Sequence, residues 1–330
     1  MIERQKQFQR NEDLESLLRE LNDRLAPVED EILKKFSTPQ YPLVLLVGCA
    51  RSGSTIMMQW LANTGEFAYP TNLLSRFYAA PYIGAKIQQM LSDPKYKFKN
   101  EFYDFGSPVS YNSDLGKTAG VLAPNEFFYF WRRFFNFGEI QYLDTVATKQ
   151  VDALKFCAEL AAIENVFDKP FAMKGLIINW NIPFIHNLLS RAVFVYIKRD
   201  TRYNAQSLIE AREKFMGDRN QWYSFKPVEY PMLEKLDPYQ QVVSQVYFTN
   251  RAIEQGLDKI DSNNWMKVEY EEFCKSPETV YQQLTKKLAI HGFQLSPKYN
   301  GPKKFKSSNQ VRLSKQHFNL ISDAYDTLAK

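Results

Sequence analysis

The apolar residues of this chain form short unbroken runs that alternate with segments of helical spacing. The unbroken runs predict strands buried on both faces, and they lie at residues 43–47, 171–178, 192–197 and 265–268. The helical spacings lie at residues 54–62, 203–215, 239–255 and 277–289. Strands that alternate with helices predict a parallel sheet joined by right-handed crossovers. The expected fold class is therefore α/β, with three layers (α/β/α) around a central parallel sheet.

Two segments depart from this alternation. Residues 11–36 place six leucines and one isoleucine at mostly helical spacing, which predicts an amphipathic helix that can break near Pro27. We favour packing of this helix on the rest of the chain, with dimerisation through it as the alternative. Residues 70–145 are rich in aromatic residues and weakly periodic, so we expect an insertion that covers the edge of the sheet. The expected organisation is an N-terminal helical extension at 1–40 and a single domain at 41–330.

Composition narrows the class of protein. Hydrophobic residues make up 45% and charged residues 24% of the 330 residues, which excludes disorder as the main state. No apolar run approaches the ~18 residues of a membrane-spanning helix, and residues 1–10 lack the apolar stretch of a secretory signal. Cys49, Cys157 and Cys274 show no CxxC pairing and no histidine at zinc spacing. We therefore expect a cytoplasmic protein without disulfides or a metal site.

The positive charge is concentrated at one end of the chain. Residues 298–330 contain seven Lys or Arg against two Asp or Glu, which accounts for the whole net charge of +5. Basic residues are not interleaved with aromatic ones over one long face, so nucleic-acid binding is the least expected function. A basic segment on a neutral body indicates a smaller anionic ligand or a solvated surface.

The segment after the first predicted strand is the most informative one. Residues 48–55 read G-C-A-R-S-G-S-T, which matches the phosphate-binding pattern G-x-x-x-x-G-K-[ST] except that Ser54 replaces the lysine. Glycines let backbone N–H groups converge on an anion, and the helix that follows adds its N-terminal dipole. The lost lysine argues against ordinary ATP hydrolysis. The candidate ligand-binding residues in this loop are Gly48, Ala50, Arg51, Ser52, Gly53, Ser54 and Thr55.

A second candidate anion site follows the strand predicted at 192–197. Arg199 stands at the carboxyl end of that strand, where parallel sheets bind ligands. Ser207 comes eight residues later, on the first turns of the next predicted helix. An arginine and a serine hydroxyl facing the same oxygens can hold a monophosphate.

Four ordered segments together resemble a known family. The segments are G-C-A-R-S-G-S-T at 48–55, R-D-T-R-Y-N-A-Q-S at 199–207, V-E-Y-E-E-F-C-K-S-P at 268–277 and S-S-N-Q-V-R at 307–312. From about residue 41 to 312, the chain resembles the sulfotransferases that use 3′-phosphoadenosine 5′-phosphosulfate (PAPS). Its loop is most similar to the branch with R-S-G-[ST]-T, which includes the tyrosylprotein sulfotransferases.

The resemblance implies a P-loop-like sulfotransferase fold and a role for each segment. The loop at 48–55 would hold the 5′-phosphosulfate, and Arg199 with Ser207 would hold the 3′-phosphate. Tyr270 would contact the nucleotide. Lys174 would assist the leaving group together with Arg51. The residues expected to close over the nucleotide are Ser307, Ser308 and Arg312, with Lys303, Lys304 and Lys306 before them.

The general base is where the chain departs from the resemblance. The tyrosylprotein enzymes carry acids about twenty residues after the loop arginine, whereas residues 69–72 here contain none. The candidates for the base are Glu126, Glu66, Glu101, Asp104 and His186. Glu126 ranks first because aromatic neighbours disfavour ionisation of a carboxyl, which suits proton transfer near neutral pH. The alternative for Glu126 is a carboxylate at a helix N-terminus.

The expected function is transfer of the sulfuryl group from PAPS to a hydroxyl of an acceptor, without a metal. A carbohydrate or glycolipid is the expected acceptor, and the aromatic-rich insertion would supply either its wall or core packing. Two alternatives stay open at this point: a P-loop-type kinase or phosphotransferase, and a non-catalytic adapter that binds a nucleotide.

Overall fold

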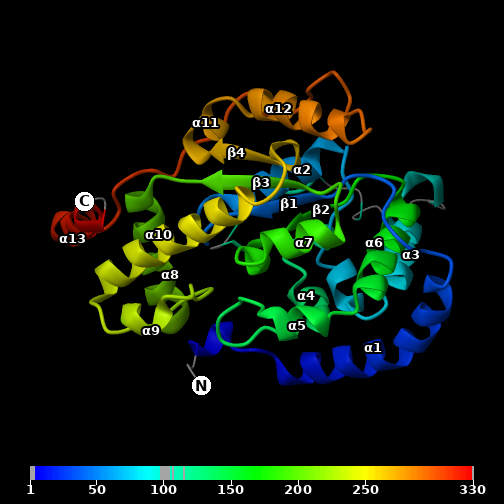
Figure 1. The fold of residues 1–330 in the computed structure, drawn as a ribbon, viewed down its shortest axis with the longest axis horizontal. Helices are drawn as coiled ribbons and strands as arrows, with labels where there is room; N and C mark the ends of the chain where they lie inside the picture. The colour runs from blue at the N-terminus through cyan, green and yellow to red at the C-terminus, as the bar shows by residue number, and fades with distance from the viewer. Residues whose placement is uncertain (1–3, 97–104, 106–107, 114–115, 329–330) are drawn as a thin grey trace.

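The computed structural model describes residues 4–96, 105, 108–113 and 116–328, and its centre is a parallel sheet covered by helices (Figure 1). The strands are β1 (Val44–Val47), β2 (Ala172–Lys174), β3 (Val193–Lys198) and β4 (Trp265–Glu269). They lie in the order β2-β1-β3-β4, and each neighbouring pair is parallel. Helices such as α2 and α7 lie on opposite sides of this sheet (Figure 1). The predicted α/β/α arrangement is confirmed.

Helices fill most of the chain between the strands. They are α1 (Glu12–Leu33), α2 (Ser54–Thr64), α3 (Pro81–Ser92), α4 (Phe128–Phe134), α5 (Thr145–Lys149), α6 (Ala153–Phe167), α7 (Ile182–Leu188), α8 (Thr201–Met216), α9 (Tyr230–Leu233), α10 (Pro238–Leu257), α11 (Tyr270–Lys275), α12 (Pro277–Ile290) and α13 (Lys315–Leu328). The helices predicted at 54–62, 203–215, 239–255 and 277–289 are α2, α8, α10 and α12. Within the described residues, every helix is too short or too polar to cross a membrane.

The strand β1 explains why its sequence is apolar without interruption. Leu45 and Val47 face a core shared with α4, α6 and α7, whereas Val44 and Leu46 face a core shared with α2 and α12. All four side chains are fully buried. A central strand of a parallel sheet has helices on both faces, so neither face tolerates a polar residue.

The strand predicted at 171–178 is shorter than expected. Only Ala172–Lys174 pairs as β2, and the chain then turns into a 3₁₀ helix, Leu176–Ile178. The turn brings Asn179 under the loop after β1, where its amide bonds both the N–H and the carbonyl of Gly48 (3.2 and 2.9 Å). The run 171–178 is buried as predicted, but only its first half contains the strand, and its second half forms this turn.

The N-terminal helix α1 continues through Pro27, so the break expected near Pro27 is not seen. Buried polar residues fasten the helix on both sides of the proline. Asn22 bonds the carbonyl of Arg76 (2.8 Å) and the N–H of Ala79 (2.7 Å). Glu29 accepts the N–H groups of Tyr82 (2.6 Å) and Ile83 (3.1 Å) at the start of α3. These contacts offset the hydrogen bond that the proline removes.

The core rings of the aromatic-rich segment gather in one part of it. Those of α4 and its flanks are buried against β1 and α6, and they are Phe127, Phe130, Trp131, Phe134 and Phe135. The segment therefore supports one face of the sheet, whereas the sequence pattern predicted cover for its edge. Phe128 differs from its neighbours because 37% of its surface is exposed.

Candidate active site

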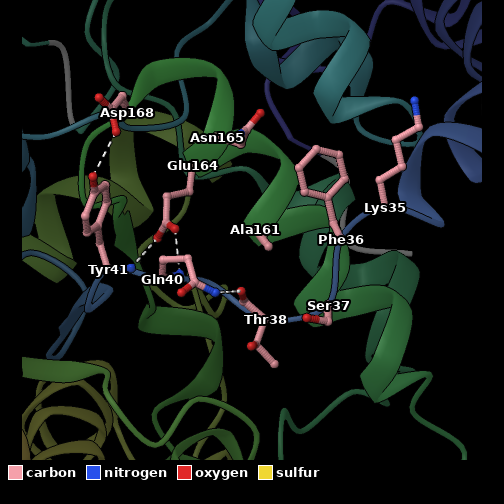
Figure 2. A pocket seen from close by; sticks show the side chains of 10 residues that line it. All are labelled: Lys35, Phe36, Ser37, Thr38, Gln40, Tyr41, Ala161, Glu164, Asn165 and Asp168. Atoms are coloured by element: carbon pink, nitrogen blue, oxygen red, sulfur yellow. Dashed lines mark hydrogen bonds between the residues drawn. The ribbon is translucent and has the colours of Figure 1, made fainter.

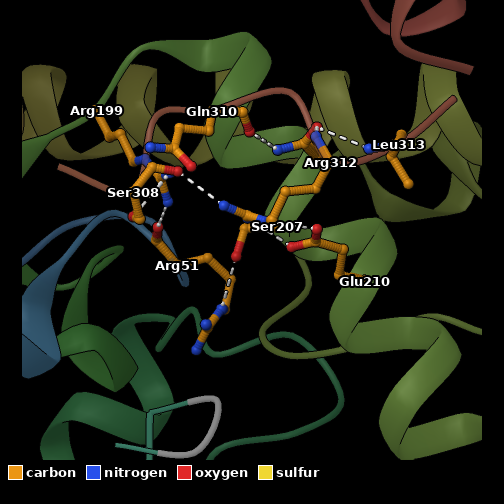
Figure 3. Close-up of polar contacts among 9 residues, drawn as sticks. Arg51, Arg199, Ser207, Glu210, Ser308, Gln310, Arg312 and Leu313 are labelled. Atoms are coloured by element: carbon orange, nitrogen blue, oxygen red, sulfur yellow. Dashed lines mark hydrogen bonds and ion pairs between the residues drawn. The ribbon is translucent and has the colours of Figure 1, made fainter. Parts of the chain in front are cut away.

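The predicted ligand-binding residues meet at the carboxyl edge of the sheet. The loop after β1 carries Arg51, the end of β3 carries Arg199, and the start of α11 after β4 carries Tyr270. Because neighbouring parallel strands end at the same edge, segments far apart in sequence come together there. Figure 3 shows Arg51, Arg199 and Ser207 in one group with residues from the C-terminal part of the chain.

Two close approaches fix the shape of the glycine loop. A Cβ on Gly48 would lie 2.6 Å from the carbonyl oxygen of Ile197, and one on Gly53 would lie 2.4 Å from the Tyr270 ring. Gly53 also has a φ of +106°, in the left-handed region that favours glycine. Asn204 of α8 holds the loop from the other side by donating to the carbonyl of Ala50 (2.7 Å).

The loop leaves hydrogen-bond donors free for an anion. Gly53 is the N-cap of α2 and provides no side-chain cap, so the N–H groups of the first turn have no partner within the helix. The hydroxyl of Ser52 is fully buried and has no hydrogen-bond partner in the described part of the chain. Together with the helix dipole, these donors fit a phosphate or sulfate oxygen.

Arg51 joins the two candidate anion sites. Its Nε donates to the Ser207 hydroxyl (3.1 Å), and its carbonyl accepts from Nη1 of Arg199 (3.0 Å). Its φ of +69° is unusual for a residue with a side chain. Burial lowers the pKa of Arg51, while Tyr223, Glu210 and Glu126 act in the opposite direction. A guanidinium removed from water in this way gains from an anionic ligand.

Arg199 is 4% exposed and makes a dense set of contacts. Its Nη2 donates to the carbonyl and hydroxyl of Ser308 (both 3.1 Å), and its Nε donates to Asn309 (2.7 Å). It also lies over the Tyr270 ring, 5.0 Å from the centroid. Burial lowers the pKa of Arg199, and the positive charges of Arg312 and Arg51 lower it further, opposed by Tyr270. The surroundings of Arg199 therefore favour a negative ligand.

Residues 305–313, here called the strap, cross over Arg199 (Figure 3). Arg312 pairs with both carboxylate oxygens of Glu210 (2.6 and 2.7 Å) and donates to the carbonyl of Ser308 (2.8 Å). Gln206 accepts the N–H of Arg312 (2.9 Å) and donates to the carbonyl of Gln310 (2.9 Å). The strap is thus held to the face of α8 that also presents Ser207.

Among the remaining residues at the strap, the serines make hydrogen bonds and the lysines are exposed. Ser308 shares a hydrogen bond with the Tyr270 hydroxyl (2.9 Å), whereas Ser307 accepts from the backbone of Asn309 (3.2 Å). Lys303, Lys304 and Lys306, which lie just before or within the strap, are exposed. The predicted cover over the nucleotide therefore lies next to Arg199 through Ser308 and Arg312, and the lysines lie at its surface.

Lys174 lies between the glycine loop and Glu126. It ends β2, is 4% exposed, and donates to the Thr55 hydroxyl (3.0 Å) and to Glu126 (3.2 Å). It belongs to an edge strand, but its ammonium group is buried and points into the site. One cation thus touches both the helix start that would hold the donor and the first-ranked candidate base.

The position of Glu126 is fixed by its neighbours. Asn125 donates its N–H to the carbonyl of Pro70 (2.8 Å) and its amide to Asn72 (2.9 Å). The Asn125 side chain also accepts the N–H of Phe127 (2.9 Å), whose φ is +56°. Residues 69–72 themselves contain no acid. The fold places Glu126, from a later part of the chain, beside them.

The other candidate bases do not join this group. Glu66 follows the far end of α2 and accepts from the N–H of Ser296 (3.5 Å). His186 is on α7, where burial lowers its pKa and Asp261, before β4, is the carboxylate that acts on it. Both therefore lie toward the amino edge of the sheet. Glu101 and Asp104 lie outside the described residues.

Several residues of the site were missed by the sequence analysis. Asn204 and Glu210 lie three residues before and after Ser207, a spacing that places all three on one helix face. That spacing was a usable signal. Asn309 adjoins Ser308 and could have been added for the same reason. Asn179 gave no signal, because only the turn after β2 brings it to Gly48.

The cavity in Figure 2 lies away from these residues. It measures about 210 Å³ and lies where residues 35–41 cross α6. Glu164 is 4% exposed there and accepts the N–H groups of Gln40 (2.6 Å) and Tyr41 (2.9 Å). Both oxygens thus have backbone partners that guide the chain into β1, which gives Glu164 a structural role.

No cluster of three or more His, Cys, Asp or Glu that could hold a metal is found among the described residues. The expectation that the reaction needs no metal stays a prediction.

Comparisons with known proteins bear on the family and the fold. The model of the sulfotransferase family matches residues 42–294. No curated protein sequence matches the chain. Among solved structures, sulfotransferase STF9 from Mycobacterium avium has 11% identity and a TM-score of 0.52, over 97% of this chain and 76% of that one. Sulfotransferase STF1 from Mycobacterium tuberculosis H37Rv has 10% identity and a TM-score of 0.49, over 94% and 82%.

Proposed function

The chain belongs to the sulfotransferase family, and we propose that it transfers the sulfuryl group of PAPS to a hydroxyl of a carbohydrate or glycolipid. The observation that carries the donor assignment is the contact of Arg199 and Ser207 with Arg51 across the carboxyl edge of the sheet. It joins one anion site at a helix start to a second one for a separate phosphate. PAPS carries its 3′-phosphate and its 5′-phosphosulfate at such separate places.

The binding roles follow from the donors of each segment. The loop 48–55 and the first turn of α2 hold the 5′-phosphosulfate, with the buried hydroxyl of Ser52 as one donor. Arg199 and Ser207 hold the 3′-phosphate, which would replace part of the present contacts of Arg199 with the strap. Tyr270, Ser308 and Arg312 close the nucleotide side, and Ser307 shapes the strap through Asn309.

The proposed chemistry is an in-line displacement at sulfur. The acceptor oxygen forms a bond to sulfur while the bond from sulfur to the 5′-phosphate oxygen breaks, and its electron pair stays on the phosphate. Arg51 and Lys174 stabilise that growing negative charge. Glu126 takes the proton of the acceptor hydroxyl. In this scheme Arg51 and Lys174 supply the charge stabilisation without a metal.

The acceptor class is supported by one partly exposed ring near Glu126. Phe128 follows Glu126 by two residues, is 37% exposed and packs edge-on against Phe225 (5.9 Å between centroids). An aromatic face beside the base can pack on the apolar face of a sugar ring. The buried rings of α4 are core and do not contribute to such a wall.

We also propose a cytoplasmic location. Cys49, Cys157 and Cys274 are all buried and unpaired, as expected for a protein kept in a reducing compartment. Dimerisation through α1 stays a prediction, which a measurement of molecular mass in solution decides.

The first experiment is thermal unfolding with 3′,5′-ADP, 5′-ADP, AMP or ATP with magnesium. A ligand at ~100 times its Kd stabilises the folded state by about 2.7 kcal/mol, which is easily measured. We expect a clear shift with 3′,5′-ADP and little with nucleotides that lack the 3′-phosphate. A shift with ATP and magnesium alone would favour a phosphotransferase instead. Binding of 3′,5′-ADP without transfer of the sulfuryl group from PAPS to any glycan of a panel would favour a non-catalytic adapter.

A further inference from the structure

Gly116 lies against the glycine loop and has no role in the scheme above. A Cβ on Gly116 would lie 3.2 Å from Nη1 of Arg51 and 3.5 Å from the hydroxyl oxygen of Thr55. Apart from the chain neighbours of Gly116, no other described residue would come within 4 Å of that Cβ. The missing side chain therefore leaves a space that a guanidinium and a hydroxyl border.

Both bordering groups have hydrogen-bonding capacity to spare. Arg51 uses Nε for its bond to Ser207, and its terminal nitrogens point away from Ser207 (Figure 3). Among the residues that the structure describes, Nη1 has no hydrogen-bond acceptor. The Thr55 hydroxyl donates to the carbonyl of Gly116 over 3.4 Å, which is a long hydrogen bond. An anionic oxygen in the space can therefore accept from Nη1 and replace the long bond of Thr55.

The contacts of Thr55 place this space between the proposed reacting groups. The Thr55 hydroxyl accepts from Lys174 (3.0 Å), and Lys174 also donates to Glu126 (3.2 Å). Arg51 and the start of α2 lie on the donor side, whereas Glu126 lies on the acceptor side. An in-line displacement needs the sulfur atom between the leaving oxygen and the acceptor oxygen. The space beside Gly116 meets that requirement.

Hydrogen bonds on two sides hold the segment 116–120 in this position. Thr118 is 6% exposed, and its hydroxyl accepts from Gln59 of α2 (2.8 Å). Its carbonyl accepts from Asn72 (3.1 Å). Asn72 also accepts from Asn125, the residue before the first-ranked candidate base (2.9 Å). The elements that carry the donor site and the base thus also fix the segment, so the space beside Gly116 is built into the fold.

We propose that the sulfuryl group occupies the space beside Gly116 during its transfer, and that glycine at this position admits it. This role rests on the proposed function. The bond from sulfur to the 5′-phosphate oxygen breaks with its electron pair left on the phosphate, the bond to the acceptor oxygen forms, and Glu126 takes the acceptor proton. The sulfuryl oxygens accept from Nη1 of Arg51 and from the Thr55 hydroxyl. Gly116 is a positioning residue, because a methyl group there would fill the space.

The test compares two alanine variants of the full chain. Gly116→Ala fills the space, and its φ of +97° adds backbone strain. Gly120→Ala is the matched control, because Gly120 has a φ of +118° but its Cβ would meet only the Cβ of Ala123, at 3.7 Å. Calorimetry gives the affinity of each variant for 3′,5′-ADP and for PAPS, which differ by the sulfuryl group. Radiolabelled PAPS gives the rate of sulfate release to water.

We expect the two variants to bind 3′,5′-ADP within about twofold of each other. Gly116→Ala should bind PAPS at least about tenfold more weakly than Gly120→Ala, because the added methyl group overpacks the space. The rate of sulfate release should fall by at least as much. If the ratio of PAPS affinity to 3′,5′-ADP affinity were equal in the two variants, Gly116 would have no part in placing the sulfuryl group.

A measurement on the unaltered protein tests the proposal even if Gly116→Ala fails to fold. Residues 115–116 are the only Leu-Gly pair in the sequence, so isotopic labelling of the leucine carbonyl carbon and the glycine nitrogen isolates the Gly116 amide signal in NMR. PAPS should shift this signal clearly more than 3′,5′-ADP does. Equal shifts would place the sulfuryl group elsewhere. Failure of the unaltered protein to bind 3′,5′-ADP would instead overturn the donor assignment, and this role with it.

Discussion

Arg51 and Ser207 are 156 residues apart in sequence, and a hydrogen bond of 3.1 Å joins the Nε of one to the hydroxyl of the other. The bond connects the loop after β1 to the second turn of α8. The carbonyl of Arg51 meanwhile accepts from Arg199 (3.0 Å). Arg51 is thus the residue through which the two ends of the donor would be held in register.

Replacing Arg51 by alanine should lower the rate of sulfuryl transfer by about 10²–10³-fold, because a charged donor to the leaving oxygen is lost. Arg51→Lys keeps the charge but loses the bond to Ser207, so its rate should lie between that of the unaltered protein and that of Arg51→Ala. Single-turnover release of sulfate from PAPS measures both. Equal rates for Arg51→Ala and the unaltered protein would remove Arg51 from the reaction.

Arg199→Ala should weaken binding of nucleotides that carry a 3′-phosphate and leave 5′-ADP binding almost unchanged. A hydrogen bond to a charged group contributes about 1.5–3 kcal/mol, which corresponds to about 10–150-fold in Kd. Arg202→Ala is the control, since Arg202 lies three residues after Arg199, at the start of α8, but pairs with Asp326 at the surface (3.3 Å). If Arg199→Ala retained the preference for 3′,5′-ADP, the 3′-phosphate site would have to lie elsewhere.

Glu126→Gln should lower kcat by at least about 10²-fold, the usual contribution of a general base. Binding of 3′,5′-ADP should be unaffected, because Glu126 contacts Lys174 on the acceptor side of the loop. Glu139→Gln serves as control, because Glu139 also pairs with a lysine, Lys226, but is exposed. Full turnover by Glu126→Gln would move the base to another residue, with Glu101 and Asp104 as the next candidates.

The stability of the fold should depend on pH through Glu159. This carboxyl is fully buried, and burial raises its pKa to about 8 despite its ion pair with Arg133. The folded state then binds a proton more tightly than the unfolded state. The contribution to stability is present in full below about pH 4.5 and is lost as pH rises toward about 8.

Glu159→Gln removes this titration, so its stability relative to the unaltered protein should rise with pH over that range. The rise should be on the order of 5 kcal/mol, from a pKa of about 8 in the folded state against 4.5 in the unfolded state. Urea unfolding at a series of pH values measures it. A stability difference that stays constant from pH 4.5 to 8 would show that Glu159 is ionised in the folded state throughout.

The two glycines that flank α2, Gly53 and Gly65, allow the cost of backbone strain to be measured apart from the cost of a steric clash. Both have positive φ, but a Cβ on Gly65 would meet nothing within 4 Å, whereas one on Gly53 would lie 2.4 Å from Tyr270. Gly65→Ala should therefore cost about 1–2 kcal/mol of unfolding free energy. Gly53→Ala should cost more and should also weaken 3′,5′-ADP binding. Equal losses in the two variants would mean that Tyr270 moves aside freely.

The fold was predictable from the sequence because its strands are buried on both faces. Unbroken apolar runs mark such strands, and the glycine spacing after residues 43–47 marks the start of a ligand loop. Arg199 and Ser207 could be predicted as a pair because Arg199 follows a predicted strand and Ser207 comes eight residues later on the next predicted helix. In these cases the signal is local, so a single sequence carries it.

The rest of the site depends on contacts that no local pattern encodes. Glu126 reaches the segment 69–72 through the bonds of Asn125 to Pro70 and Asn72, about fifty residues earlier in the chain. Asn179 reaches Gly48 because β2 ends early and the chain turns beneath the loop. Tertiary packing decides each of these placements.

The approach of Gly53 to the Tyr270 ring also has an evolutionary consequence. The ring occupies the space that a side chain at position 53 would need, and the same ring lies over Arg199 and bonds the strap. A chain that gained a larger residue at position 53 would have to give up the aromatic residue at 270 and reshape the nucleotide side of the site. Substitutions at positions 53 and 270 should therefore covary during evolution, because the residue at each position limits which residues the other can accept.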